Sequence, residues 1–393
     1  MISVFTPSSN TQYLDEAYQS LLDQTYTDWE WIVVLNGNAT QIPIWSPEDE
    51  RVKVYRTNEL DGNIGALKRY ACEKCNGPIL VELDHDDILM PRALESIREA
   101  FFDHPDASFV YSDCAAIDAE GKPILTEYSA DYGWRYYESG EYHVARSMEP
   151  HPHNVAYIWW APNHVRAFRA SSYKDVGGYN TDLSILDDQD LMIRLYQEGR
   201  FVHIPKLLYL QRNHDGNTQK VPEINARIQT ETVEIANANL NSMARKWAQR
   251  RNKNVISLNG YYSDEYNGIE DDSAGVIEAH DYVQFLDKPR DFIEDCYNML
   301  CDGGMLFITV PSTDGRGAFQ DLRHRSFWNE NSFWYFTKRE YAKYYGDYVR
   351  FQVSNITNYF PSEWHRAHNI VYVRATLIAV KTDDHRFGGV LTI

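Results

Sequence analysis

Acidic side chains crowd the end of one apolar run, in the stretch "VELDHDDILM" at residues 81–90. The four acids are Glu82, Asp84, Asp86 and Asp87. Carboxylates this close together raise one another's pKa and destabilise a fold unless something neutralises them. Capping of a helix that starts near Pro91 would explain one or two of them, because Asp is favoured at helix N-termini. The other acids need a different explanation.

Strands and helices alternate around these acids. Strands are predicted at residues 2–8, 29–37, 78–84 and 107–113, and helices at 13–26, 64–75 and 91–104. This alternation predicts a largely parallel α/β sheet with helices on both faces, in which ligands bind at the carboxyl ends of the strands. Pro7, Asn36 and Asp84 fall at such ends, so we expect the acids to belong to a site.

The sequence pattern changes at two points in the rest of the chain. Residues 122–165 are rich in Tyr, Trp and His, which indicates either a substrate-facing insertion or core aromatics beneath a long loop. Residues 221–247 have apolar side chains at helical spacing and predict one or two connecting helices. Beyond residue 253 a second, smaller α/β domain is expected, with a helix over 289–304 that Gly303 and Gly304 close.

Composition limits the function classes. The 393 residues carry a formal net charge of −19, which argues against nucleic acid and against an anionic membrane surface as partners. No stretch is apolar for long enough to span a membrane, and no leader is recognised. The five cysteines show no zinc-finger spacing and suit a reducing compartment. We therefore expect a cytoplasmic protein.

The amino-terminal part resembles the GT-A-fold glycosyltransferases of family two. The resemblance covers residues 1–217 and rests on blocks that occur in the family's order. The blocks are "ISVFTPS", "YLDEAYQSLLDQTYTDWEWIVVLNG", "NIGALKRYA", "LVELDHDDILMP", "YSDCAAIDAEGKPI", "FRASSYKDVGGYN" and "LDDQDLMIRLYQEGRFVHIPKLLYLQRNH". It implies a Rossmann-like, mostly parallel GT-A domain, a nucleotide-sugar donor and an acceptor hydroxyl.

The resemblance also assigns roles to individual residues. Asp86 would ligate Mn²⁺ or Mg²⁺, with His214 as a further ligand, and Asp84 would reach the donor ribose or the metal. The metal would stabilise the charge of the departing diphosphate. Asp188 would be the general base, unless it only caps a helix. Thr6 and Pro7 would line the nucleotide base. Asp87 is expected to cap the following helix, and Glu82 to be structural.

One departure concerns the second strand. The family usually has an Asp at its end, whereas this chain has Leu35 and Asn36. Asn36 can hydrogen-bond a base edge but carries no charge. Asp61 and Asn63 are candidates to compensate from the next loop, and Lys68 is a candidate to approach the diphosphate.

The carboxy-terminal part resembles the back half of S-adenosylmethionine-dependent methyltransferases. It lacks the glycine-rich turn and the acidic residue that would cradle the cofactor, so we expect an incomplete domain that does not bind it. Its exposed sheet edge is expected to be covered by the connecting helix or by a second subunit, the latter giving a homodimer.

These observations predict a GT-A domain at 1–217, a helical connector at 218–252 and a truncated methyltransferase-like domain at 253–393. The expected function is metal-dependent, inverting transfer of a sugar from a UDP-linked donor to a hydroxyl of a glycan or related acceptor. The alternatives are a bifunctional glycosyl/methyltransferase and a non-catalytic sugar- or cation-binding protein.

Overall fold

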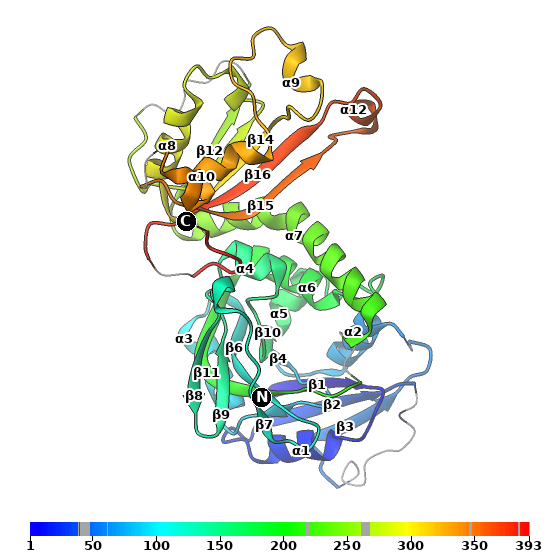
Figure 1. The fold of residues 1–393 in the computed structure, drawn as a ribbon. Coiled ribbons are helices and arrows are strands. Elements are labelled where there is room, and N and C mark those ends of the chain that lie inside the picture. Colours follow the sequence, from blue (N-terminus) through cyan, green and yellow to red (C-terminus); the bar gives the residue numbers. More distant parts are fainter. Residues whose placement is uncertain are drawn as a thin grey trace. The chain divides into compact units, whose positions relative to one another are not determined.

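The chain folds as two compact units. The computed structural model describes residues 1–37, 39, 48–60, 62–216, 220–260, 268–345, 348–383 and 386–392 (Figure 1). Unit 1 comprises Met1–Ala130, Trp134–Pro150 and Asn154–Asn239, and unit 2 is built chiefly from the chain that follows Leu240. Helix α7, Pro222–Arg250, is a single helix where the sequence predicted one or two. The predicted bounds of the three domains stay predictions.

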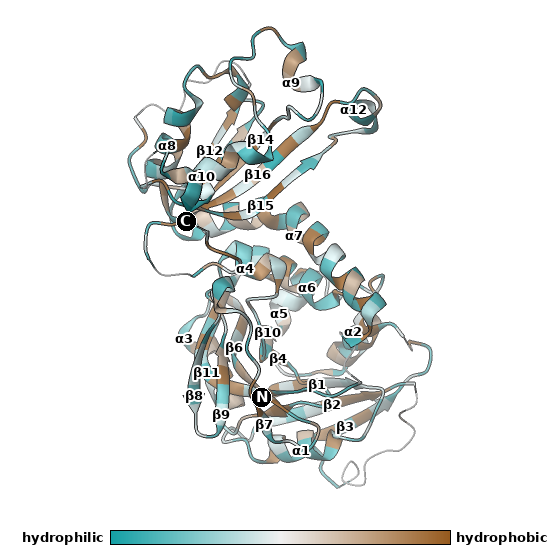
Figure 2. Ribbon diagram, in the orientation of Figure 1, coloured by the Kyte–Doolittle hydropathy of each residue, from teal (hydrophilic) through white to brown (hydrophobic). Residues whose placement is uncertain are grey.

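Four parallel strands form the first half of unit 1. They are β1 (Ile2–Ser8), β2 (Trp29–Leu35), β3 (Val52–Arg56) and β4 (Ile79–Glu82), in the order β3-β2-β1-β4. Helices α1 (Leu14–Leu22) and α2 (Ile64–Lys74) connect them. The alternation of strands and helices predicted here is confirmed, with β3 as an additional strand. Every residue of β1 and β2 is buried, and Figure 2 shows these strands as largely apolar.

The second half of unit 1 is mixed rather than parallel. Its elements are β5 (Ile88–Leu89), α3 (Ala93–Asp103), β6 (Ala107–Ile117), β7 (Pro123–Ile124), β8 (Arg135–Ser139), β9 (Tyr142–Arg146), α4 (Pro152–Tyr157), β10 (Arg166–Arg169), α5 (Ala170–Asp175), α6 (Asp187–Glu198) and β11 (Arg200–Arg212). Strand β10 is antiparallel to both of its neighbours, β4 and β6. After β6 the chain passes through the β8–β9 hairpin and no long crossover helix, so β10 runs in the opposite direction. The expectation of a largely parallel sheet is wrong for this half.

Unit 2 contains a five-stranded sheet in the order β12-β13-β14-β16-β15. The strands are β12 (Asn254–Asn259), β13 (Ala274–His280), β14 (Leu300–Pro311), β15 (Phe351–Tyr359) and β16 (Tyr372–Ala379), and the helices are α8 (Pro289–Met299), α9 (Gly317–Gln320), α10 (Trp334–Thr337), α11 (Arg339–Ala342) and α12 (Glu363–Ala367). The first three strands are parallel, and β16 is antiparallel to β14 and β15. Helix α8 ends at Met299, so the prediction that Gly303 and Gly304 close it is wrong. Both glycines lie in β14, where its register against β13 shifts.

Helix α7 contributes its last turns to unit 2. Arg245 and Asn241 bind Glu278 of β13, with 2.9 Å between Asn241 Nδ2 and Glu278 Oε1. The helix therefore covers a face of the sheet rather than its β12 edge. Among the residues that the structure describes, none forms a helix with the length and apolar character needed to cross a bilayer.

Candidate active site

The carboxyl ends of β1, β2 and β4 meet at one edge of the unit 1 sheet. The Asn36 N–H donates to the Ser8 carbonyl over 2.9 Å, and the Leu83 N–H donates to the Phe5 carbonyl over 3.2 Å. The predicted convergence of these three strand ends is therefore present. Asp84 follows β4 at this edge, directly after the buried Leu83.

Thr6 and Pro7 lie inside the sheet rather than in a loop. Strand β1 continues to Ser8, and Pro7 is paired with Val34 of β2. The Thr6 hydroxyl donates to the Leu83 carbonyl over 2.7 Å and accepts from Trp31 Nε1 over 2.9 Å. The Thr6 side chain therefore links β1 to its neighbours, and contact of Thr6 and Pro7 with a nucleotide base stays a prediction.

A buried lysine neutralises part of the acidic cluster. Lys68 Nζ of α2 lies 2.9 Å from Glu82 Oε1 and 3.1 Å from Asp187 Oδ2, and all three side chains are buried. Gly65 permits this approach, because a Cβ at that position would lie 2.5 Å from the Asn180 carbonyl oxygen. Lys68 is thus held by two carboxylates in this structure, a position that the sequence prediction of a diphosphate contact did not include.

Glu82 is the centre of this network. Tyr179 donates its hydroxyl to Glu82 Oε2 over 2.9 Å, and Arg166 Nη1 lies 3.7 Å from Oε1. Burial opposes ionisation of Glu82, but Lys68 and Arg166 outweigh it and lower the pKa of Glu82 to about 2. For Asp187 burial outweighs Lys68, so its pKa is raised.

Asp188 lies beside a second buried cation. Arg166 Nη1, from β10, donates to Asp188 Oδ2 over 2.8 Å, and Asp188 Oδ1 accepts from the Gln189 N–H over 2.8 Å. The N-cap residue of α6, Leu186, provides no side-chain cap, whereas Asp188 accepts a first-turn N–H of the helix, so the base and the helix-cap alternatives for Asp188 both stay open. The Asp188 side chain is 24% exposed whereas that of Arg166 is 11% exposed, so the carboxylate is the more accessible partner.

Asp86 and His214 meet although 128 residues separate them in the sequence. His214 Nε2 lies 2.8 Å from Asp86 Oδ2, just beyond the end of β11. The Tyr13 ring lies against the His214 ring, with 5.5 Å between centroids. The structure thus brings the two predicted metal ligands together.

Asp87 does not cap the following helix. Strand β5 intervenes, α3 begins at Ala93 with Arg92 at its N-cap position, and Asp87 Oδ1 instead accepts from the Arg212 N–H over 2.7 Å. The helix-cap prediction for Asp87 is therefore wrong. Burial and the neighbouring carboxylates raise the pKa of Asp87, and burial and Glu82 raise that of Asp84 to about 7. Four carboxylates, those of Glu82, Asp84, Asp187 and Asp188, interact with Lys68 and Arg166, whereas Asp86 lies beside His214 and Asp87 beside Arg212.

The remaining donor-site candidates have varied positions. Asn63 is the N-cap of α2, where its Oδ1 accepts from the Ala66 N–H over 2.9 Å and its Nδ2 donates to the Thr181 carbonyl over 2.6 Å. Asn36 is buried at the end of β2. Asp61 lies outside the described residues.

Sequence reasoning missed the roles of Arg166, Asp187 and Tyr179 in this cluster. Asp187 and Tyr179 fall in blocks that carry the family resemblance, but nothing in those blocks marks them as partners of Lys68 and Glu82. The charge balance of the sequence was the one useful signal. Several acids close together require buried cations nearby, and the local sequence pattern did not indicate which residues these are.

Parts of this chain are similar to a known protein family and to known proteins. Residues 3–157 match the family model described as Glycosyl transferase family 2. The chondroitin synthase of Escherichia coli is 27% identical over 221 residues, which cover 56% of this chain and 30% of that protein. The chondroitin synthase of Pasteurella multocida (strain Pm70) is 22% identical over 297 residues, or 74% of this chain and 27% of that protein. Residues 3–157 are therefore similar to glycosyl transferase family 2, and the relatives named here are glycan synthases.

The chain spans less than a third of the length of both chondroitin synthases. The crystal structure of S. aureus TarS 1–349 in complex with UDP-GlcNAc aligns with 64% of this chain and 71% of that one, at 18% identity and a TM-score of 0.46.

Proposed function

We propose that the protein is a metal-dependent, inverting glycosyltransferase that moves a sugar from a UDP-linked donor to a hydroxyl of a glycan or related acceptor. The observation that carries this proposal is the acidic cluster after β4, comprising Glu82, Asp84, Asp86 and Asp87, within the segment that matches glycosyl transferase family 2. In α/β sheets of this kind ligands bind at the carboxyl ends of the strands. A cytoplasmic location is part of the same proposal.

The residues present fit a divalent cation. Asp86 offers a carboxylate and His214 an imidazole nitrogen at the same point, and no set of three or more ligating side chains occurs among the described residues. A cation held by two protein groups leaves positions for diphosphate oxygens and water, as is usual for Mg²⁺ and Mn²⁺ at nucleotide sites. When bound, the metal would stabilise the negative charge of the leaving diphosphate.

Asp188 would accept the proton of the acceptor hydroxyl. In an inverting transfer the hydroxyl attacks the anomeric carbon from the face opposite the diphosphate, and its proton must leave as the new bond forms. Arg166 would hold the Asp188 carboxylate in place, and the positive end of α6 favours its ionised form. Leu186, just before α6, has a left-handed backbone with φ of 60°, a strained conformation that is frequent near functional sites.

A measurement of nucleotide binding tests this proposal, and it does not require that the acceptor be known. Isothermal titration of UDP and of UDP-linked sugars should show binding in Mn²⁺ that is lost in EDTA. The Asp86→Ala variant should lose this metal-dependent binding while it keeps its fold. A wild-type protein that binds no sugar nucleotide in Mn²⁺ would favour the non-catalytic alternative.

For unit 2 we propose an incomplete methyltransferase-like domain with a packing or docking role. The order β12-β13-β14-β16-β15, with β16 antiparallel to its neighbours, supports this assignment, as does the absence of a further strand beside β12 among the described residues. S-adenosylmethionine should then neither bind nor stabilise the protein. Calorimetric binding at micromolar concentration would favour the bifunctional alternative. A homodimer through this unit is part of the proposal and is testable by sedimentation.

A further inference from the structure

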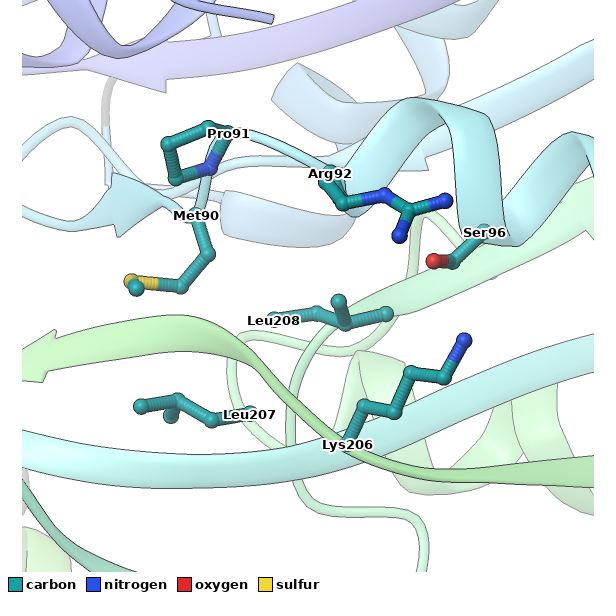
Figure 3. A pocket seen from close by; sticks show the side chains of 7 residues that line it. All are labelled: Met90, Pro91, Arg92, Ser96, Lys206, Leu207 and Leu208. Carbon is teal, nitrogen blue, oxygen red and sulfur yellow. The ribbon is translucent and has the colours of Figure 1, made fainter. Parts of the chain in front are cut away.

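One cavity in unit 1 is lined by none of the acidic residues described above. It has a volume of about 320 Å³ and is lined by Met90, Pro91, Arg92, Ser96, Lys206, Leu207 and Leu208 (Figure 3). One wall is the start of α3 and the other is the irregular part of β11, where the register against β6 shifts between Ile204 and Leu207. This shift places Lys206 beside the start of α3.

Ser96 is the unexplained group in this cavity. Ser96 is only 3% exposed, and its hydroxyl has no hydrogen-bond partner among the residues that the structure describes. A buried hydroxyl without a partner is unfavourable by roughly 1–3 kcal/mol, so such groups are rare unless a ligand or water satisfies them. Figure 3 shows this hydroxyl at the same end of the cavity as the Arg92 guanidinium and the Lys206 ammonium.

Two cations, Arg92 and Lys206, line the cavity beside Ser96, and the carboxylates of Glu95 and Glu99, outside the lining, interact with Arg92. Arg92 uses its Nε to bind Glu95 Oε2 over 2.8 Å, which leaves its two terminal nitrogens for a ligand. Glu95 also accepts from the Thr25 hydroxyl over 3.1 Å and interacts electrostatically with Lys206, for which the described residues provide no ion pair. The Leu94 N–H is taken by Gln24 Oε1, so an anion would bind to side chains, with the positive end of α3 as an additional attraction.

We propose that this cavity binds the phosphate group of a phosphomonoester that has a compact apolar body. Ser96 would donate its hydroxyl, and Arg92 and Lys206 would supply charge-assisted hydrogen bonds. The cavity is larger than one phosphate group requires, and Met90, Leu207 and Leu208 provide an apolar wall for the rest of the ligand. The inference does not depend on the proposed glycosyl transfer.

Calorimetry in EDTA tests the site, because EDTA removes any divalent cation through which phosphate could bind to Asp86 and His214. Inorganic phosphate and phenyl phosphate are the probes. We expect both to bind, and phenyl phosphate to bind roughly tenfold more tightly because its ring covers the apolar wall. Binding that is equal for the two probes would contradict the apolar part of the proposal, and absence of binding would overturn the site.

Two variants separate a ligand group from a structural one. Ser96→Ala should weaken phenyl phosphate binding at least about tenfold, yet leave the melting temperature unchanged or raised, because its hydroxyl has no partner to lose. Lys206→Gln should weaken binding several-fold and reduce its salt dependence, whereas Lys174→Gln, at an exposed lysine of α5, should leave binding unchanged. A lowered melting temperature with unchanged binding in Ser96→Ala would overturn the proposal.

Discussion

Removal of the Lys68 charge should destabilise unit 1 strongly. Lys68→Met keeps most of the side-chain volume but leaves Glu82 and Asp187 buried without their shared cation. Loss of one partner from a buried ion pair typically destabilises a protein by about 3–5 kcal/mol, because an uncompensated charge remains in a medium of low polarity.

The structure gives a second measure of this effect. The pKa of Glu82 falls from 4.5 to about 2, which corresponds to on the order of 3 kcal/mol of folding free energy, with Arg166 contributing a share. A lowered folded-state pKa stabilises the protein above pH 4.5, and that stabilisation is lost as the pH falls towards 2. In Lys68→Met the unpaired Glu82 would take up a proton at a higher pH than in wild type. The variant and wild type should therefore differ less in their free energy of unfolding at pH 4.5 than at pH 7.

Urea denaturation followed by tryptophan fluorescence at both pH values measures these differences. Lys174→Met, an exposed lysine, should change the free energy of unfolding by less than about 0.5 kcal/mol. Lys68→Met combined with Glu82→Gln and Asp187→Asn should recover most of the loss, because no buried charge of the trio remains unpaired. The reasoning is refuted if Lys68→Met stays within about 1 kcal/mol of wild type at pH 7, or if the triple variant is no more stable than the single one.

Three further outcomes are expected. Asp188→Asn should bind sugar nucleotide and Mn²⁺ as wild type does and transfer sugar at least roughly a hundredfold more slowly in a coupled UDP-release assay; wild-type turnover would move the base to Asp187 or Asp190. His214→Ala should weaken the Mn²⁺ dependence of UDP binding without loss of fold by circular dichroism, and unaltered dependence would remove it from the ligand set. Asp113→Ala should lower the free energy of unfolding by about 2–4 kcal/mol in urea, because buried Asp113 accepts from the Ser147 N–H and the Tyr137 hydroxyl and pairs with His203; a neutral effect would contradict that account.

The sequence was sufficient for features that depend on local pattern. Apolar runs with short helical connections predicted β1, β2, β4 and α2. The position of the acids directly after a predicted strand indicated that they lie at the carboxyl ends of the strands. The meeting of Asp86 with His214 could be predicted only through the resemblance, because no local pattern links residues so far apart. Asn63 could have been recognised as a helix cap, since Asn directly precedes the helical pattern that starts at Ile64.

Other features depend on tertiary structure. The antiparallel direction of β10 follows from a hairpin whose strands carry no strong signal in an aromatic-rich stretch. The positions of Lys68 and Arg166 depend on how α2 and β10 pack around β4, and no spacing in the chain encodes those contacts. Asp87 was misjudged because two-residue β5 separates it from α3, and so short a strand has no readable period.

Release of UDP from sugar nucleotides is the most direct test of the central claim. The intact chain would be incubated with a panel of UDP-linked sugars and a glycan mixture, with Mn²⁺ or with EDTA, beside Asp188→Asn. We predict release by wild type from at least one donor in Mn²⁺, none in EDTA, and at least a hundredfold slower release by Asp188→Asn. Equal release by wild type and Asp188→Asn, or release that persists in EDTA, would contradict a metal-dependent transfer with Asp188 as its base.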